Sequence, residues 1–316
     1  MTKTIAIVAC LVGLAGCDDD DTTMEANQDL SPATTMDLST PDLAVRRTAD
    51  LPLTFQPEGL WWDSATQALY IANDGGQQII RWREDLDSFV VEARLPEIAA
   101  SAGSLGQVVK AKDNSLLVTR FGFSQAGAVL QVKSDGTIGS IGGLDVKRRR
   151  IGLTVAADGT VFDGWYLVVA PSKTPMMGTV SKLALDGTGE TDLVTGIGKP
   201  VGLLALGDQL YISDQLNGLV LKTPLASPGT TTTFATVAGA DELAAGPGGV
   251  IFAASNTGTV WSIASNGTPT SLHDGYKALR GIAYDGDHKR LFVSEPDAGN
   301  PDGGAGMPML HVLPID

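Results

Sequence analysis

A single phrase recurs along most of this chain, and its spacing limits the fold more than any other feature. The first copy reads EGLWWDSATQALYIAND from position 58, with an apolar run, a polar turn and a second apolar run. Two short apolar runs joined by such a turn predict a β-hairpin. Weaker copies return at intervals of 39 to 50 residues, and the six copies begin at Glu58, Leu105, Ile151, Val201, Asp241 and Arg280.

Each predicted hairpin is followed by further short apolar runs that turn on Asp-Gly, Asn-Gly or Pro-Gly, as in GTVWSIASNGTPTSL at 258–272. Such dipeptides are favoured in tight turns between strands, so each unit is expected to contain four antiparallel strands. A period of this length, with one small sheet per repeat, is typical of a β-propeller. The sequence therefore predicts an all-β fold, a six-bladed β-propeller over residues 51–316.

The two ends of the predicted propeller complete each other. Copy six has a third apolar run, MLHVLPI at 309–315, and too few residues for a fourth. The run LPLTF at 51–55 precedes copy one and has no partner of its own. Pairing these two runs would close the ring and remove its exposed strand edges. We therefore expect the N-terminal strand to complete the last blade.

The N-terminus has the pattern of a secretory signal, with Lys3, an apolar run and small residues before Cys17. The apolar run is too short to span a bilayer as a stable helix. The sequence Leu-Ala-Gly-Cys at 14–17 resembles the bacterial lipobox. This resemblance implies that residues 1–16 are a lipoprotein signal peptide, that cleavage precedes Cys17 and that lipid on Cys17 holds the protein to a membrane. The alternative is an ordinary signal whose cleavage site adjoins a cysteine.

Residues 17–50 follow as an acidic segment, with nine Asp or Glu and two Arg after Cys17. A segment rich in Asp, Thr and Pro with almost no aromatic residues predicts a disordered linker. The whole chain carries a formal net charge of −14, which argues against nucleic acid as a partner. We expect a protein of the bacterial cell envelope, on the periplasmic side of the inner membrane or in the outer membrane.

The repeats resemble the senescence-marker-protein and gluconolactonase-like family, with its strictosidine-synthase and NHL-repeat relatives. The stretches that carry the resemblance are PEGLWWD, KPVGLLALGDQLYISD and RGIAYDGDHKRLFVSE. The resemblance covers residues 51–316 and implies a divalent metal in the central channel, held by a Glu of blade one, an Asn of blade four and an Asp of blade five. Such a metal would polarise a lactone carbonyl.

The residue before the recurring glycine opens the innermost strand of each blade, and is expected to face the channel. By the resemblance, Glu58 matches the first metal ligand and Asp241 the third, whereas Val201 replaces the Asn. Gln107 and Arg150 are alternative channel residues for blades two and three. Ring closure places Arg280 between Asp241 and Glu58, where a guanidinium would pair with both carboxylates and repel a cation.

Three interpretations of the channel stay open at this stage: an ion-pair cluster that plugs it, a site for a divalent cation such as calcium, and a site where Arg280 binds an anionic ligand. The three histidines, His273, His288 and His311, lack metal-ligand spacing. The sequence favours a lipid-anchored binding protein that recognises a small molecule or a protein partner at a propeller face. The alternative is a calcium-dependent hydrolase of lactones or esters.

Overall fold

A computed structural model of the chain describes residues 49–315, apart from 87, 99–102, 170, 171, 173 and 299–305. The predicted signal peptide, Cys17 and nearly all of the predicted linker lie outside the described residues. Within those residues, no helix is both long enough and apolar enough to cross a membrane.

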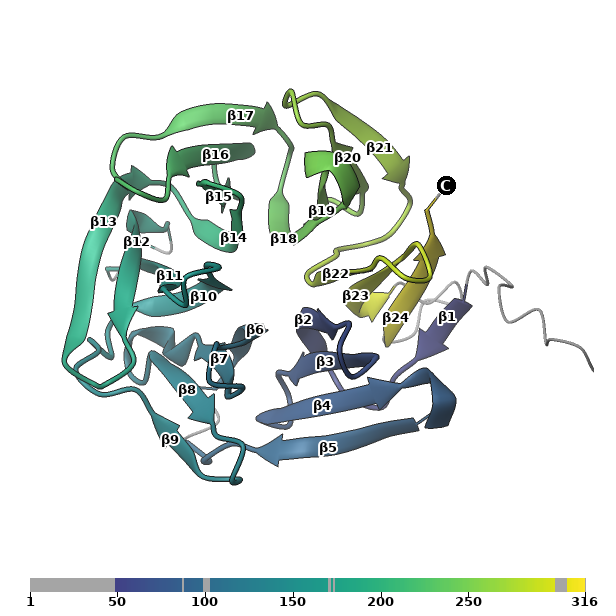
Figure 1. The fold of residues 1–316 in the computed structure, drawn as a ribbon, viewed down its shortest axis with the longest axis horizontal. Coiled ribbons are helices and arrows are strands. Elements are labelled where there is room, and N and C mark those ends of the chain that lie inside the picture. The colour runs from purple at the N-terminus through teal and green to yellow at the C-terminus, as the bar shows by residue number, and fades with distance from the viewer. Residues whose placement is uncertain are drawn as a thin grey trace, which may run out of the picture. The chain divides into compact units, whose positions relative to one another are not determined.

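Six four-stranded antiparallel sheets follow one another in chain order around a central axis, as predicted (Figure 1). Blade one contains β2 (Pro57–Asp63), β3 (Ala68–Asn73), β4 (Gln78–Arg83) and β5 (Ser88–Arg94). Blade two contains β6 (Leu105–Lys110), β7 (Leu116–Arg120), β8 (Ala128–Val132) and β9 (Ile138–Ser140). Blade three contains β10 (Arg149–Val155), β11 (Val161–Leu167), β12 (Met176–Ala184) and β13 (Gly189–Ile197).

Blades four to six continue the ring (Figure 1). Blade four contains β14 (Pro200–Leu206), β15 (Gln209–Asp214), β16 (Leu219–Pro224) and β17 (Thr232–Thr236). Blade five contains β18 (Ala240–Ala245), β19 (Ile251–Ser255), β20 (Val260–Ile263) and β21 (Pro269–His273). Blade six contains β22 (Ile282–Asp285), β23 (Arg290–Ala298), β24 (Met307–Pro314) and β1 (Ala49–Pro52). Short 3-10 helices span Glu84–Leu86, Gly122–Ser124 and Pro247–Gly249.

The N-terminal strand closes the last blade, as the sequence predicted. Strand β1 pairs antiparallel with β24, from Ala49 opposite Val312 to Pro52 opposite Met309. It begins two residues earlier and ends three residues earlier than the apolar run at 51–55 suggested, and the Asp50 carboxylate also bonds to His311 Nδ1 at 2.7 Å. The ring is thus joined by backbone pairing and by this side-chain contact.

The apolar core lies between the blades rather than in one central mass. Six clusters of buried side chains each join two neighbouring blades. Trp61 packs with the cluster between blades one and two, and its neighbour Trp62 with the cluster between blades six and one. Successive residues of a strand point to opposite faces, so one hydrophobic run serves two interfaces.

The innermost strands come so close together at the recurring glycine that a side chain has little room there. A Cβ on Gly59 would lie 2.5 Å from Gln107 Cα, and a Cβ on Gly202 would lie 2.0 Å from the Asp241 carbonyl oxygen. The pairing register shifts at this point in the innermost strands of blades one to five. A register shift of this kind is a β-bulge, and it turns the side chains beside it toward the channel.

Candidate functional site

The mouth of the channel holds the three charged residues that the sequence placed together. Glu58 lies in β2, Asp241 lies in β18, and Arg280 comes just before β22. Arg280 Nη1 donates to Asp241 Oδ2 at 3.1 Å, and Arg280 Nε lies 4.0 Å from Glu58 Oε1. The guanidinium therefore lies between the carboxyl groups, with 36% of the Arg280 side chain exposed.

A second cation belongs to the same mouth. The ammonium group of Lys199, which precedes β14, donates a hydrogen bond to Gln215 Oε1. Gln215 Nε2 in turn donates a hydrogen bond to Asp241 Oδ2 at 2.7 Å. Burial lowers the pKa of Lys199, and the carboxylates of Asp241 and Glu58 oppose this shift. Burial likewise raises the pKa of Asp241, against the opposing charges of Arg280 and Lys199.

The Glu58 carboxyl group holds its proton to a higher pH than an ordinary glutamate does. Burial raises its pKa to about 8, because the loss of hydration outweighs the attraction of the Arg280 guanidinium. The nearby carboxylates of Asp241 and Asp74 raise it further. The mouth therefore has one fewer negative charge than its composition suggests.

These residues do not fit the divalent-metal site that the family resemblance implies. The guanidinium of Arg280 already binds the Asp241 carboxylate, and Lys199 adds a second positive charge. Val201 is 1% exposed and has no oxygen to offer as a ligand. Across the described residues, no three His, Cys, Asp or Glu side chains are grouped so that they could hold a metal ion.

Below the mouth, two buried side chains from opposite blades meet and block the channel. Gln107 of blade two is 4% exposed and Glu242 of blade five is 3% exposed. Gln107 Nε2 donates to Glu242 Oε1 at 3.0 Å. We call this pair the channel plug.

The channel plug bonds to the innermost strands of the remaining four blades. Glu242 Oε2 accepts hydrogen bonds from the backbone N–H groups of Leu60 and Ile282, both at 2.9 Å. Gln107 Oε1 accepts from the N–H groups of Leu153 and Leu203, at 2.6 and 3.1 Å. These four N–H groups would otherwise be buried without a partner, so one side-chain pair satisfies donors from blades one, three, four and six.

The sequence predicted Gln107 as a channel residue but did not identify Glu242. The available signal was positional, because Glu242 occupies the place of the recurring glycine in copy five. A large acidic residue at a glycine position implies that its side chain has an exit from the packed layer. Burial raises the pKa of Glu242 to about 8, although every hydrogen bond that it accepts favours the ionised form.

A cavity of about 270 Å³ lies on the other side of the channel plug. Its wall includes Leu60, Leu153, Leu203 and Ile282, with Trp62 and Tyr284 farther along the innermost strands. Gln107 and Glu242 also line this cavity, together with Lys110 and Thr154, so the plug divides the channel into a charged mouth and a chamber with both polar and apolar walls.

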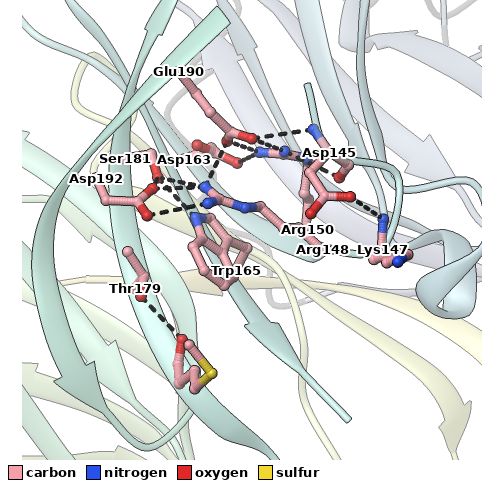
Figure 2. A network of polar contacts seen from close by, with 11 residues as sticks. Asp145, Lys147, Arg148, Arg150, Asp163, Trp165, Thr179, Ser181, Glu190 and Asp192 are labelled. Carbon is pink, nitrogen blue, oxygen red and sulfur yellow. Dashed lines mark hydrogen bonds and ion pairs between the residues drawn. The ribbon is translucent and has the colours of Figure 1, made fainter. Parts of the chain in front are cut away.

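Arg150 was a predicted channel residue, and the structure corrects this prediction. The register shift between Arg150 and Gly152 turns the Arg150 side chain onto the face of blade three. It is fully buried there, where it pairs with Asp163 and bonds both carboxylate oxygens of Glu190 at 2.8 Å (Figure 2). Leu105, another expected channel residue, packs instead in the core between blades one and two.

Arg148 joins the same polar cluster from the connection that leads into β10. Its guanidinium stacks on the Trp165 ring at 3.7 Å and pairs with Asp192 at 2.6 Å (Figure 2). Ser181 Oγ accepts a hydrogen bond from Trp165 Nε1 and donates to Asp192, both at 2.7 Å. Burial raises the pKa of Asp163 to about 6, against the attraction of Arg150. This cluster ties the four strands of blade three together and lies away from the channel mouth.

Comparison with solved structures identifies the architecture. A gluconolactonase of Xanthomonas campestris has a TM-score of 0.64 and 20% identity, with 85% of this chain and 90% of that one covered. The shared fold is that of the gluconolactonase and regucalcin propellers. A calcium-binding regucalcin of Agrobacterium tumefaciens gives 0.63 and 18%, with coverage of 84% and 93%. A luciferin-regenerating enzyme gives 0.66 and 14%, with coverage of 85% and 96%. No family model and no curated protein sequence matches the chain. At these identities the likeness shows the fold alone.

Proposed function

We propose that this propeller is a binding protein that holds a small carboxylate-bearing molecule at the mouth of its channel. The observation that carries the proposal is the position of Arg280, whose partly exposed guanidinium lies at the centre of the mouth with one close carboxylate partner. A guanidinium has five N–H donors and binds carboxylates in a two-pronged geometry. Arg280 therefore keeps donors for an incoming anion.

The charge balance of the mouth supports the same conclusion. With Glu58 protonated, Asp241 is the only carboxylate in hydrogen-bonding contact with Arg280 in the described part of the chain. Lys199 forms no ion pair with a described residue and bonds to the neutral Gln215. The mouth thus has more cationic than anionic groups, in a protein whose net charge is −14. Such a local reversal of charge attracts small anions.

The second candidate is a calcium-dependent hydrolase of lactones or esters. It is favoured by the gluconolactonase among the structural neighbours and by the position of Glu58 and Asp241 at the channel mouth. It requires a cation to displace Arg280 from Asp241 and a proton to leave Glu58. It also lacks a ligand at Val201. We therefore rank it below carboxylate binding.

Thermal unfolding with added ligand separates the two candidates. A ligand that binds the native state at ten times its dissociation constant stabilises that state by about 1.4 kcal/mol. Sodium gluconate or butanoate is expected to raise the melting temperature above that in sodium chloride of equal ionic strength, and Arg280→Gln is expected to abolish the rise. Equal melting temperatures in all three salts would refute carboxylate binding. Stabilisation by calcium that disappears in Asp241→Asn would establish the hydrolase candidate instead.

We also propose that lipid on Cys17 anchors the propeller to a membrane of the bacterial cell envelope. The proposal rests on the lipobox-like sequence at 14–17 and on the acidic segment that separates it from β1. Mass spectrometry of the membrane fraction should find an acylated N-terminal peptide beginning at Cys17. Release of the Cys17→Ser protein into the soluble periplasm is the matched control, and a wild-type protein that is equally soluble would refute anchoring.

A further inference from the structure

An aromatic cluster extends the channel mouth toward the rim of blades two and three. Lys199 Nζ lies 5.8 Å from the centre of the Tyr166 ring, and Tyr166 lies edge to face with Phe121 at 5.9 Å. Phe121 in turn contacts Phe123, with ring centres 4.7 Å apart. The contacts therefore run without a break from a cation of the mouth to Phe123. We call Phe121, Phe123, Arg149 and Tyr166 the aromatic arm.

Phe123 is exposed at the outer end of the arm on a constrained backbone. Its side chain is 40% exposed, and its φ of 47° lies in the left-handed region, as do the φ angles of Gly122 and Ser124. Left-handed backbone at a non-glycine residue is unfavourable, and an exposed ring contributes little to the core. Stability therefore does not account for a phenylalanine at this position.

Arg149 differs from the two arginines beside it. Arg148 and Arg150 pair with carboxylates of blade three, whereas Arg149 forms no ion pair with a described residue. Its guanidinium lies over Phe121 at 5.1 Å and Phe123 at 5.8 Å, and its Nε donates to Ser124 Oγ at 2.9 Å. Arg149 is thus a positive charge held by aromatic rings and a hydroxyl group.

The proximity of Tyr166 joins Arg149 to the channel mouth. Burial raises the pKa of Tyr166, and the charges that act on it include Arg149, Asp241 and Arg280. Two cations without carboxylate partners among the described residues, Lys199 and Arg149, therefore flank one buried ring. Aromatic faces beside cations suit a ligand that has both a flat aromatic ring and a negatively charged group.

We infer that the ligand of this site is a carboxylate with a flat aromatic ring, bound with its carboxylate between Lys199 and Arg280 and its ring on Phe123 and Arg149. This inference rests on the proposed function and adds the chemistry of the other end of the ligand. The ring would cover the exposed face of Phe123 and stack on the Arg149 guanidinium. The exposed and constrained Phe123 is then explained as a recognition surface.

Calorimetric titration with three propanoates that differ only in the group on carbon 3 (phenyl, cyclohexyl or methyl) tests the inference. The probes are 3-phenylpropanoate, 3-cyclohexylpropanoate and butanoate, each titrated into the full-length mature chain in detergent. We expect 3-phenylpropanoate to bind at least tenfold more tightly than butanoate, and more tightly than the saturated-ring probe. Phe123→Gly, which suits the left-handed backbone, should reduce that tenfold advantage to less than threefold. Leu86→Ala is the control, because Leu86 is also exposed but lies in a different blade, in the connection between β4 and β5 of blade one.

The outcomes separate the inference from the function on which it rests. If butanoate and 3-phenylpropanoate bind equally, and Arg280→Gln weakens both, carboxylate binding stands and the aromatic arm has no role. If none of the three probes binds the wild type, both proposals fail. If 3-phenylpropanoate binding is lost in Phe123→Gly and unaffected in Arg280→Gln, the rim binds apolar rings without the mouth, which also overturns both proposals.

Discussion

Exchanging the two residues of the channel plug is the sharpest test of its structure. In Glu242→Gln the amide oxygen can still accept from Leu60 and Ile282, but its nitrogen then faces the nitrogen of Gln107. If the Gln107 amide rotates by 180°, its oxygen can accept from the new amide at position 242, but its nitrogen then faces the N–H groups of Leu153 and Leu203, and donor again meets donor. The substitution therefore leaves buried donors without an acceptor in either arrangement.

The expected cost follows from this count. A buried donor left without its acceptor costs about 1–3 kcal/mol, so Glu242→Gln is expected to lower the free energy of unfolding by that amount. Gln107→Glu is also expected to destabilise, because it places two carboxyl groups in contact. The double exchange, with Glu at 107 and Gln at 242, restores a donor opposite an acceptor at every contact of the plug. It should recover most of the loss, with a coupling energy of about 1–3 kcal/mol.

Urea unfolding at pH 9, above the pKa of about 8 that burial gives Glu242, measures this coupling in the wild type, both single variants and the double variant. Glu97→Gln is the control, because it removes the same charge from an exposed position. Single variants as stable as the wild type, or a double variant whose loss equals the sum of the single losses, would refute the hydrogen-bonding arrangement of the plug.

The carboxyl groups of Glu242 and Glu58 also make the free energy of unfolding depend on pH. Burial raises the pKa of both Glu242 and Glu58 to about 8 from an ordinary value of 4.5. The native state therefore holds these protons more tightly than the unfolded chain does. The resulting stabilisation is complete below pH 4.5 and is lost as the pH rises through 8. Each group contributes up to about 1.4 kcal/mol per pH unit over that range. Glu242→Gln is thus expected to reduce the slope of stability between pH 6.5 and 8, and an unchanged slope would contradict this.

Three further predictions concern the mouth, blade three and the aromatic arm. Ionisation of Glu58 adds a negative charge beside Arg280, so carboxylate affinity should fall as the pH rises through 8, and Glu58→Gln should keep its affinity in calorimetric titrations from pH 6.5 to 9. Asp163→Asn leaves the buried Arg150 with fewer counter-charges and should cost about 3–5 kcal/mol by urea unfolding, whereas a cost under 1 kcal/mol would contradict a buried ion pair. Phe123→Gly should change stability by less than about 1 kcal/mol, because backbone relief offsets the greater freedom of the unfolded chain. Phe292→Ala, at a position that is 0% exposed, should cost about 3–5 kcal/mol, and urea unfolding measures both variants.

The number and composition of the blades were predictable because their signals are local. A hairpin is specified by alternating apolar residues and by its turn, all within a few neighbouring positions. Counting strands then sufficed to predict that the N-terminal strand completes blade six. The neighbourhood of Glu58, Asp241 and Arg280 also followed, because ring closure makes blade six adjacent to blades five and one.

The side-chain directions at the channel were not predictable from alternation alone. A β-bulge adds one residue to a strand and reverses which face the next side chain takes. Arg150, at the start of the register shift in blade three, points onto the face of that blade, whereas Gln107, which lies within the register shift of blade two, points into the channel. Sequence periodicity shows where strands lie, but it does not show where a single extra residue is inserted.

What the sequence by itself determined was the toroid, its six blades and the charged trio at its mouth, because each depends on a repeat and on the order of the blades. Only the tertiary structure decided that Gln107 and Glu242, 135 residues apart, bond to each other and to the strands around them. It also decided that Lys199, Tyr166, Arg149 and Phe123 form one continuous run of contacts. These contacts join side chains of different blades across the channel and the rim, where their length and direction matter and no local pattern records them.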